Sequence, residues 1–136
     1  MDAHEPHRFA LRVYWEDTDA AGIVYYANYL RFIERARTEA LLAKGIRQTE
    51  LRARLGVVFA VREVGVRYLA PARLEDQLVV TTAVGRVAGA RLELRQDVLR
   101  DGVPLAECLV TLACLGPDGR PARVPDAVRD AFGGGR

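Results

Sequence analysis

Hydrophobic and polar positions alternate along several short segments, which is the pattern of β-strands that bury one face. The first segment covers residues 9–15, where one side of the predicted strand carries Phe9, Leu11, Val13 and Trp15. Four later runs, rich in β-branched and aliphatic residues, predict strands over residues 57–69, 78–87, 91–99 and 105–115. A change of phase near Gly65 indicates a bend or bulge in the second of the five strands.

Helical spacing replaces this alternation between residues 28 and 44. Charged side chains take one side of the predicted helix, and the other side carries Tyr29, Ile33, Ala36, Ala40 and Ala43. Asn28 is a suitable N-cap for the helix, and Gly45 is a suitable stop. Two shorter helices are predicted over residues 49–55 and 126–132.

The order of these elements predicts an α+β domain. Hairpin-type turns at residues 87–90 and 100–103 join the last three strands into an antiparallel meander, and the long helix buries its apolar face on the sheet. One helix cannot cover both faces and the edges of five strands, so we also expect at least a dimer. The 136 residues predict one domain over residues 9–132, between a flexible N-terminal tail (1–8) and disordered residues 133–136.

Missing residue types restrict the chemistry more than the charge does. The sequence has no serine, and its two histidines, His4 and His7, both lie in the predicted N-terminal tail. A serine nucleophile is therefore excluded, and a histidine triad or a zinc site would have to be built from that tail. The formal net charge of +2, with 28% charged residues, gives no reason to expect nucleic acid as a partner.

The two cysteines predict buried thiols rather than a disulfide. Cys108 and Cys114 lie six positions apart in one predicted strand, which places them on the same face and about 20 Å apart. Isolated thiols of this kind suit a reducing compartment. No segment approaches the roughly 18 apolar residues of a membrane span, and the N-terminus lacks the apolar stretch of a signal peptide, so we expect a cytoplasmic protein.

The densest polar chemistry lies where the first strand meets the long helix. Asp17 and Asp19 are followed by the small residues Ala20, Ala21 and Gly22, ahead of the helix N-terminus. A carboxylate there can attack a carbonyl or activate water, while backbone N–H groups hold the developing oxyanion of acyl transfer. On this reasoning the two aspartates are equal candidates. The alternative is a solvated turn whose aspartates cap local N–H groups.

The same region resembles a known family. The segment RVYWEDTDAAGIVYYANYLRFIERARTEAL is similar to the signature of hotdog-fold acyl-CoA thioesterases of the 4-hydroxybenzoyl-CoA thioesterase class, most closely the subgroup associated with the Tol-Pal system. VRYLAPARLEDQLVV and TLACLGPDGRPARVP agree in order and spacing, so the resemblance extends over residues 9–126. It implies a hotdog fold, with the sheet wrapped around the helix, and hydrolysis of acyl-CoA to a carboxylic acid and free coenzyme A without a metal or redox cofactor. It further implies dimers, often paired into tetramers, with sites between subunits.

The resemblance also assigns roles to residues. The family's catalytic carboxylate corresponds to Asp19, as general base or as nucleophile through a mixed anhydride, which leaves Asp17 a structural role. The backbone N–H of Tyr26 is the implied oxyanion contact. Many close relatives have histidine at this position. Tyrosine in its place keeps the backbone N–H donor but lacks the imidazole side chain. The approach of the substrate is lined by Gly22, Ile23 and Val24.

Other residues near the turn have plainer interpretations. A solvated set of charge pairs on an exposed helix face is predicted for Glu34, Arg37 and Glu39. Core packing is predicted for the aromatic residues around the turn, with the wall of an acyl pocket as the alternative; these residues are Tyr14, Trp15, Tyr25, Tyr26 and Tyr29. The arginines in or beside turns that are available for coenzyme A phosphates are Arg86, Arg91, Arg120 and Arg123.

Two alternatives to a thioesterase follow from the same sequence. A hotdog dehydratase usually relies on a buried histidine, and the chain has no histidine after His7. A non-catalytic module for acyl-CoA or acyl-carrier protein would bind its ligand tightly without turnover. A non-catalytic binding module would have no obvious need for the carboxylate of Asp19. Acyl-carrier protein is also an alternative carrier of the thioester substrate.

Overall fold

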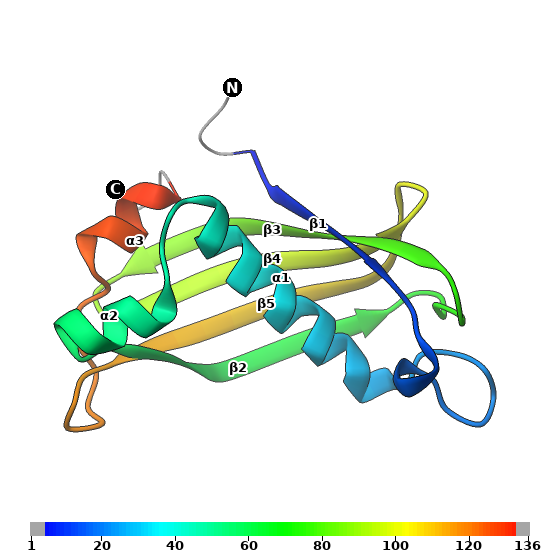
Figure 1. The fold of residues 1–136 in the computed structure, drawn as a ribbon, viewed down its shortest axis with the longest axis horizontal. Helices are drawn as coiled ribbons and strands as arrows, with labels where there is room; N and C mark the ends of the chain where they lie inside the picture. The colour runs from blue at the N-terminus through cyan, green and yellow to red at the C-terminus, as the bar shows by residue number, and fades with distance from the viewer. Residues whose placement is uncertain (1–4, 133–136) are drawn as a thin grey trace.

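An antiparallel sheet wraps around one long helix in the computed structural model, which describes residues 5–132 (Figure 1). The main elements are β1 (His7–Arg12), α1 (Tyr29–Ala43), α2 (Gln48–Leu55), β2 (Val58–Tyr68), β3 (Gln77–Ala88), β4 (Arg91–Arg100), β5 (Val103–Leu115) and α3 (Asp126–Ala131). The strands lie in the order β1-β3-β4-β5-β2, and every neighbouring pair is antiparallel. The α+β prediction with five strands and one long helix is confirmed.

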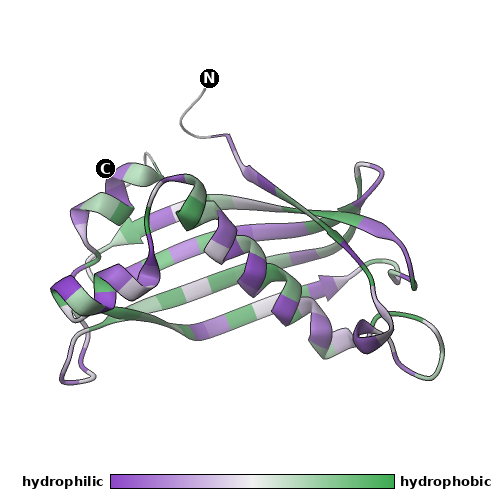
Figure 2. Ribbon diagram, in the orientation of Figure 1, coloured by the Kyte–Doolittle hydropathy of each residue, from purple (hydrophilic) through white to green (hydrophobic). Residues whose placement is uncertain are grey.

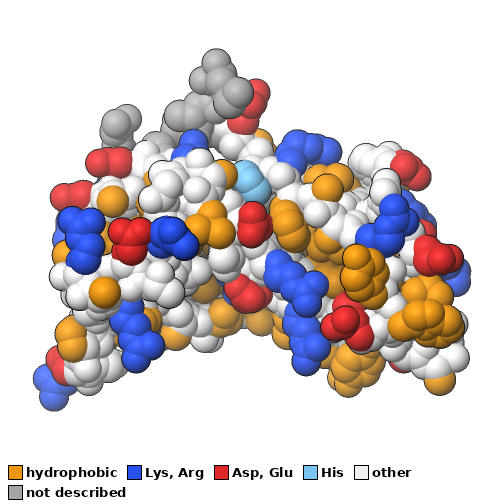
Figure 3. All heavy atoms as spheres, in the orientation of Figure 1, with side chains coloured by type: hydrophobic (Ala, Val, Ile, Leu, Met, Phe, Trp, Pro, Cys, Tyr) orange, Lys and Arg blue, Asp and Glu red, His pale blue; other side chains and the backbone are white. Residues whose placement is uncertain are grey.

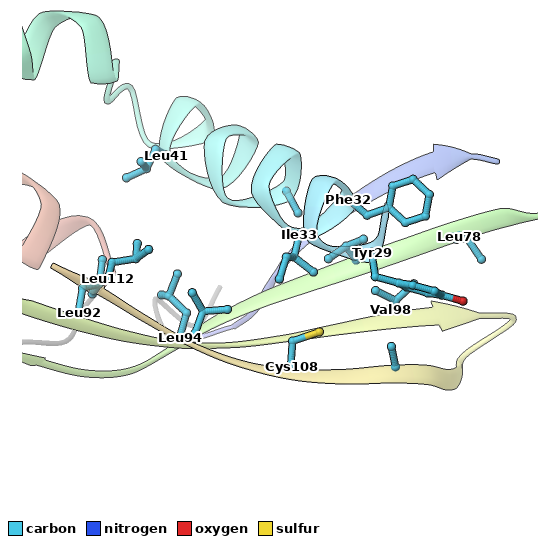
Figure 4. Close-up of a cluster of buried hydrophobic side chains, with 14 of the residues drawn as sticks. Tyr29, Phe32, Ile33, Leu41, Leu78, Leu92, Leu94, Val98, Cys108 and Leu112 are labelled. Carbon is cyan, nitrogen blue, oxygen red and sulfur yellow. The ribbon is translucent and has the colours of Figure 1, made fainter. Parts of the chain in front are cut away.

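The hydrophobic core lies between α1 and the sheet. Tyr29, Phe32 and Ile33 are each at most 2% exposed and point from α1 toward the strands (Figure 4). Hydropathy alternates along the strands, as expected when a sheet buries one face (Figure 2). Cys108 and Cys114 are buried in β5 as free thiols, as predicted. Burial raises the pKa of Cys108 to about 11 and also raises the pKa of Cys114.

Helix α1 ends where the sequence predicts but begins differently. Gly45 has a left-handed φ of 77°, and Ile46 N–H donates to the Leu41 carbonyl (3.0 Å), which closes the helix. At the other end, Asn28 occupies the N-cap position without capping the helix. Its side-chain amide donates instead to the carboxylate of Asp17 (2.8 Å). The predicted side-chain cap is therefore wrong: Asn28 has helical backbone angles (φ −72°, ψ −19°) instead of the extended ones of a capping residue, and its side chain is turned toward Asp17.

Strand β1 is shortened at the end that leads to the acidic turn. It runs from His7 to Arg12, so Trp15 lies outside it and is 79% exposed instead of buried. The chain leaves the sheet because Tyr14 and Asp17 bond each other. Tyr14 N–H donates to the Asp17 carboxylate (2.8 Å), and Asp17 N–H donates to the Tyr14 carbonyl (3.0 Å). The predicted strand was therefore too long at this end.

The predicted tails fall largely outside the described residues. The residues outside the described range are 1–4, which include one of the two histidines, and 133–136. The N-terminal tail predicted over residues 1–8 overlaps β1, because His7 pairs with Thr82 of β3. His7 therefore belongs to the sheet, at the end of β1 that lies away from the acidic turn.

The meander of β3, β4 and β5 forms as predicted, whereas the irregularity in β2 does not lie at Gly65. The register of β2 against β5 shifts between Val61 and Glu63, which leaves Arg62 as the extra residue of a bulge. A second shift, in β3 against β4, lies at Gly85. The change of phase identified the correct strand but missed the position of the bulge.

Candidate active site

The acidic turn folds as a small hairpin between β1 and α1. At its base, Tyr25 N–H donates to the Asp17 carbonyl (2.9 Å). Further along, Asp19 N–H donates to the Ile23 carbonyl (2.9 Å), and Gly22 N–H closes the tip on the Asp19 carbonyl (3.0 Å). Asp19 therefore stands at the tip of the hairpin, and Asp17 stands at its base.

Asp17 is buried, with 4% of its surface exposed. Both of its carboxylate oxygens are occupied: Oδ2 accepts the Tyr14 N–H (2.8 Å), and Oδ1 accepts the Asn28 amide (2.8 Å). These bonds satisfy a carboxylate that burial would otherwise destabilise. Asp17 therefore joins the end of β1 to the start of α1, and it presents no open oxygen to a substrate.

Asp19, in contrast, is exposed. Its Oδ1 accepts the N–H of Ala21 (2.8 Å), two residues further on, in the manner of an Asx turn. Its Oδ2 accepts no hydrogen bond from any residue between 5 and 132. The local bond orients the carboxylate and leaves one oxygen open. This geometry distinguishes two aspartates that residue chemistry leaves equal.

The three residues predicted to line the approach of the substrate differ in position. Gly22 has a φ of 78°, which favours glycine, and nothing lies within 4 Å of where a Cβ would stand. Ile23 is half-buried and forms a bridge with Arg73. Val24 is 3% exposed, and its N–H donates to the Ala72 carbonyl (2.8 Å). The Val24 side chain therefore belongs to the core.

Tyr26 opens a short 3₁₀ helix, η2 (Tyr26–Asn28), which leads into α1. As the first residue, it has no acceptor for its N–H within the helix. Asn28 N–H donates to the Tyr25 carbonyl (2.8 Å), and in a trans peptide the N–H points opposite to the carbonyl. The Tyr26 N–H therefore points away from α1, at the positive end of the helix dipole.

Most of the aromatic residues near the turn lie at the surface rather than in the core. The exposed fractions are 60% for Tyr14, 79% for Trp15, 48% for Tyr25, 63% for Tyr26 and 2% for Tyr29. Hydrophobic side chains gather at this end of the molecule (Figure 3). The core-packing prediction is therefore confirmed for Tyr29 and wrong for the other four. Exposed apolar patches of this kind are typical of surfaces that contact a ligand or a partner.

A cavity of about 240 Å³ lies between α1 and the sheet. Its walls are mainly apolar and include Leu41, Phe59, Leu92, Leu94, Leu112 and Val128. Polar atoms from α1 reach it from Glu34, Arg37 and Thr38. Glu34 is exposed, and its carboxylate accepts the Thr38 hydroxyl (2.7 Å). An apolar cavity with a few polar groups at its wall is typical of a site for a small organic group.

The helical pattern predicts that Arg37 belongs to a solvated charge pair, but in the structure it does not. It is half-buried and donates to the side chain of Gln96 (3.1 Å), which is fully buried. Gln96 donates in turn to the Ile33 carbonyl and the Thr82 hydroxyl, both at 2.9 Å. Burial lowers the pKa of Arg37. The prediction is wrong because this polar network draws the side chain in between α1 and the sheet.

A hollow of about 380 Å³ lies on the sheet face that points away from α1. Its lining includes Arg62, Arg86, Ala88, Ala90, Arg91 and Glu93. Within the described part of the chain, none of these three arginines forms an ion pair. Of the four arginines predicted for phosphate binding, the structure brings Arg86 and Arg91 together, whereas Arg120 and Arg123 do not line the hollow. The bulge in β2 adds Arg62, which the sequence analysis missed.

Residues 5–132 form neither a metal-binding cluster nor a membrane-spanning helix. Within residues 5–132, no group of three or more His, Cys, Asp and Glu side chains is placed to hold a metal ion. None of the helices described there is long and apolar enough to cross a membrane. The chemical groups that this end of the molecule offers include the Asp19 carboxylate and the backbone donors before α1.

Comparison with known proteins identifies the family. The model of the thioesterase-like superfamily matches residues 13–132. The chain belongs to the thioesterase-like superfamily. It is 40% identical over 126 residues to the acyl-CoA thioesterase YbgC of Haemophilus influenzae, which covers 91% of this chain and 92% of that protein. It is also 40% identical over 127 residues to the acyl-CoA thioester hydrolase YbgC of Escherichia coli O157:H7, which covers 92% of this chain and 94% of that protein.

A solved structure supports the same assignment. The crystal structure of a probable thioesterase from Bartonella henselae superposes with a TM-score of 0.85 at 35% identity, over 88% of this chain and 99% of that chain. The hotdog fold implied by the sequence resemblance is therefore confirmed for this member of the thioesterase-like superfamily.

Proposed function

We propose that the protein hydrolyses an acyl-CoA thioester to a carboxylic acid and free coenzyme A. One observation carries the proposal: the exposed Asp19 carboxylate keeps an oxygen open at the tip of a hairpin that leads into the N-terminus of α1. A carboxylate near unpaired backbone donors is the combination that acyl transfer needs. The two YbgC relatives, named for acyl-CoA thioester hydrolysis, support the same activity here.

Asp19 acts on the thioester by one of two routes. As a general base, its open oxygen takes a proton from water while the water oxygen bonds to the carbonyl carbon. As a nucleophile, that oxygen itself bonds to the carbonyl carbon, and water then cleaves the resulting mixed anhydride. In both routes the C–S bond breaks, and the coenzyme A thiolate leaves with the bonding electrons and takes up a proton. Both routes require the same ionised carboxylate.

The Tyr26 backbone N–H holds the negative charge that develops on the carbonyl oxygen. It is the first donor of η2, it points away from α1, and the dipole of the following helix adds partial positive charge. Because the donor belongs to the backbone, a tyrosine at this position supplies the same N–H group as the histidine of many relatives. No imidazole takes part in this mechanism.

The active unit in this proposal is a dimer joined through β2. The 11 residues of β2 form one edge of the sheet, and Val58 and Val61 on this strand are 41% and 51% exposed. An open edge with apolar side chains favours pairing with a second copy. Antiparallel pairing of two β2 edges brings the acidic turn of one copy toward the cavity under α1 of the other. This cavity then receives the acyl group, and two such dimers form the tetramer that the resemblance implies.

The arginine-lined hollow suits the phosphates of coenzyme A. Arg62, Arg86 and Arg91 are guanidinium groups without ion-pair partners in the described chain, and guanidinium groups bind phosphate in a bidentate manner. Acyl-carrier protein is the second candidate carrier, because it also presents a thioester. We place the protein in the cytoplasm, where reducing conditions keep both buried thiols free.

Release of free thiol from a panel of acyl-CoA and acyl-carrier-protein thioesters tests the proposed activity. The expected result is turnover of at least one acyl-CoA without added metal. Tight binding without turnover across the panel contradicts the proposal and favours a non-catalytic binding module. Light scattering at micromolar concentration tests the dimer, with an expected mass of at least twice the 15.0 kDa of one chain. A mass of one chain contradicts it.

A further inference from the structure

Tyr68 connects the end of β2 to the turn that carries the proposed oxyanion donor. Its hydroxyl donates a 2.7 Å hydrogen bond to the carbonyl of Tyr26, 42 residues earlier in the chain. Its ring also packs edge-on against the rings of Tyr26 and Tyr29, with centroid distances of 6.3 and 5.3 Å. One side chain therefore contacts this turn through both its polar and its apolar part.

Two hydrogen bonds fix the peptide planes on either side of the Tyr26 Cα atom. The first plane contains the Tyr25 carbonyl and the Tyr26 N–H, and it is held by the Asn28 N–H. The second plane contains the Tyr26 carbonyl, and it is held by the Tyr68 hydroxyl. Because each peptide is planar, φ and ψ of Tyr26 alone relate the two planes. Holding both planes therefore fixes the direction of the Tyr26 N–H.

The groups around this contact are themselves held in place. Tyr29, whose ring Tyr68 contacts, is 2% exposed, and its hydroxyl accepts the Ala72 N–H (3.0 Å). Burial raises the pKa of the Tyr68 hydroxyl, which keeps it protonated and able to donate. The side chain of Tyr68 as a whole is 47% exposed within one chain, so packing inside the chain does not by itself explain why a tyrosine stands here. The hydrogen bond to Tyr26 does explain it.

We propose that Tyr68 is a positioning residue for thioester hydrolysis, because its hydroxyl fixes the turn whose Tyr26 N–H holds the oxyanion. This inference rests on the proposed function. A donor that moves slightly loses much of its interaction with the transition state and little of the binding of the ground-state substrate. Loss of the Tyr68 hydroxyl therefore lowers kcat and leaves KM nearly unchanged.

Tyr68→Phe tests the inference, since it removes the hydroxyl and keeps the ring. We expect kcat to fall about tenfold, the effect of one lost hydrogen bond, with KM within about twofold of the parent value. Exchange of the backbone amides of Tyr26, Ala27 and Asn28 with solvent becomes faster in this variant. Thr49→Val removes the hydroxyl of an exposed residue on α2, away from the site, and it keeps the parent's kcat and amide exchange.

The outcomes separate this inference from the proposed function. If Tyr68→Phe keeps the parent's kcat, the inference about Tyr68 is overturned. A loss of activity that appears in KM instead of kcat also overturns the inference. If the parent chain hydrolyses no acyl-CoA, the proposed function fails, and amide exchange alone decides whether Tyr68 fixes the turn. Unchanged exchange at residues 26–28 then overturns the inference, and faster exchange supports the positioning contact.

Discussion

The side-chain amide of Asn28 donates a 2.8 Å hydrogen bond to the buried carboxylate of Asp17, 11 residues earlier in the chain. The other oxygen of that carboxylate accepts the N–H of Tyr14 (2.8 Å). One buried side chain thus joins the end of β1, the base of the hairpin and the start of α1. Asp17 supplies this support, whereas Asp19 at the tip of the same hairpin keeps one carboxylate oxygen without a hydrogen bond from the described residues.

Replacement of Asp17 tests its structural role. Asp17→Ala lowers the free energy of unfolding by about 2 kcal/mol, because the variant leaves the Tyr14 N–H and the Asn28 amide without their acceptor. Urea denaturation of the parent and the variant measures the difference. Asp19→Asn, at an exposed position, is the matched control and changes this free energy by less than about 0.5 kcal/mol. Equal unfolding free energies for Asp17→Ala and the parent would show that the contact does not support the fold.

Asp76 stabilises the loop before β3 in a pH-dependent manner. Its carboxylate accepts the Arg73 N–H (2.8 Å) and the Arg100 side chain (2.6 Å). Burial raises the pKa of Asp76, but these hydrogen bonds and the charges of the two arginines outweigh burial, so the pKa lies below its ordinary value. The unfolded chain therefore binds this proton more tightly than the folded chain. The stability that Asp76 contributes is present above its unfolded pKa and is lost as the pH falls through its folded pKa.

Asp76→Asn is therefore destabilising at neutral pH and much less so in acid. We expect the free energy of unfolding to fall by about 1 kcal/mol at about pH 7, and by less at about pH 2, because the parent's folded carboxyl group takes up its proton as the pH falls through its lowered pKa. Urea denaturation at both pH values measures this. Glu39→Gln, at an exposed position on α1, serves as the control and has little effect at either pH. A loss of equal size at both pH values would contradict the assignment to ionised Asp76.

The cavity under α1 makes a prediction about acyl-chain length. Val61 lines the cavity and is 51% exposed, so Val61→Trp narrows the cavity without disturbing the core. We expect kcat/KM for long-chain acyl-CoA to fall at least about tenfold more than kcat/KM for acetyl-CoA. Val58→Trp is the control, because Val58 lies on the same strand, is 41% exposed and does not line the cavity. If Val61→Trp slows long and short chains equally, the cavity is not the acyl site.

Periodicity predicted the sheet well because burial of one face governs most of its strands. The strand predicted over residues 78–87 is β3 (Gln77–Ala88), and the one predicted over residues 91–99 is β4 (Arg91–Arg100). The pattern failed at Trp15, which continues the alternation but lies outside β1. A hydrogen bond from the Tyr14 N–H to a side chain ends the strand there, and hydropathy does not report such a bond.

The candidate site was predicted in part for a similar reason. Residue chemistry located it at the acidic turn, and the resemblance to the thioesterases selected Asp19 over Asp17. The bond from Asn28 that occupies Asp17 joins residues on different elements, so no local pattern reveals it. No sequence pattern indicated the role of Tyr68. Its acceptor, Tyr26, lies 42 residues away, and the alternation of hydrophobic and polar residues in a strand does not report what a hydroxyl group bonds to.

Asp19→Asn provides the central test, and the chain offers a matched control for it. The Oδ1 atom of Asp19 accepts the N–H of Ala21 (2.8 Å), and the Oδ1 atom of Asp118 likewise accepts the N–H of Arg120 (3.0 Å), two residues further on. Asparagine preserves this turn at both positions, because its amide oxygen also accepts. The two variants therefore differ in whether they remove the carboxylate proposed for the reaction.

The measurement is kcat for hydrolysis of the best acyl-CoA substrate by the parent, Asp19→Asn and Asp118→Asn. We expect kcat to fall about 100-fold or more in Asp19→Asn, while the free energy of unfolding stays at the parent's value. For Asp118→Asn we expect the parent's kcat. An Asp19→Asn variant as active as the parent would contradict the assignment of Asp19 as the reacting carboxylate.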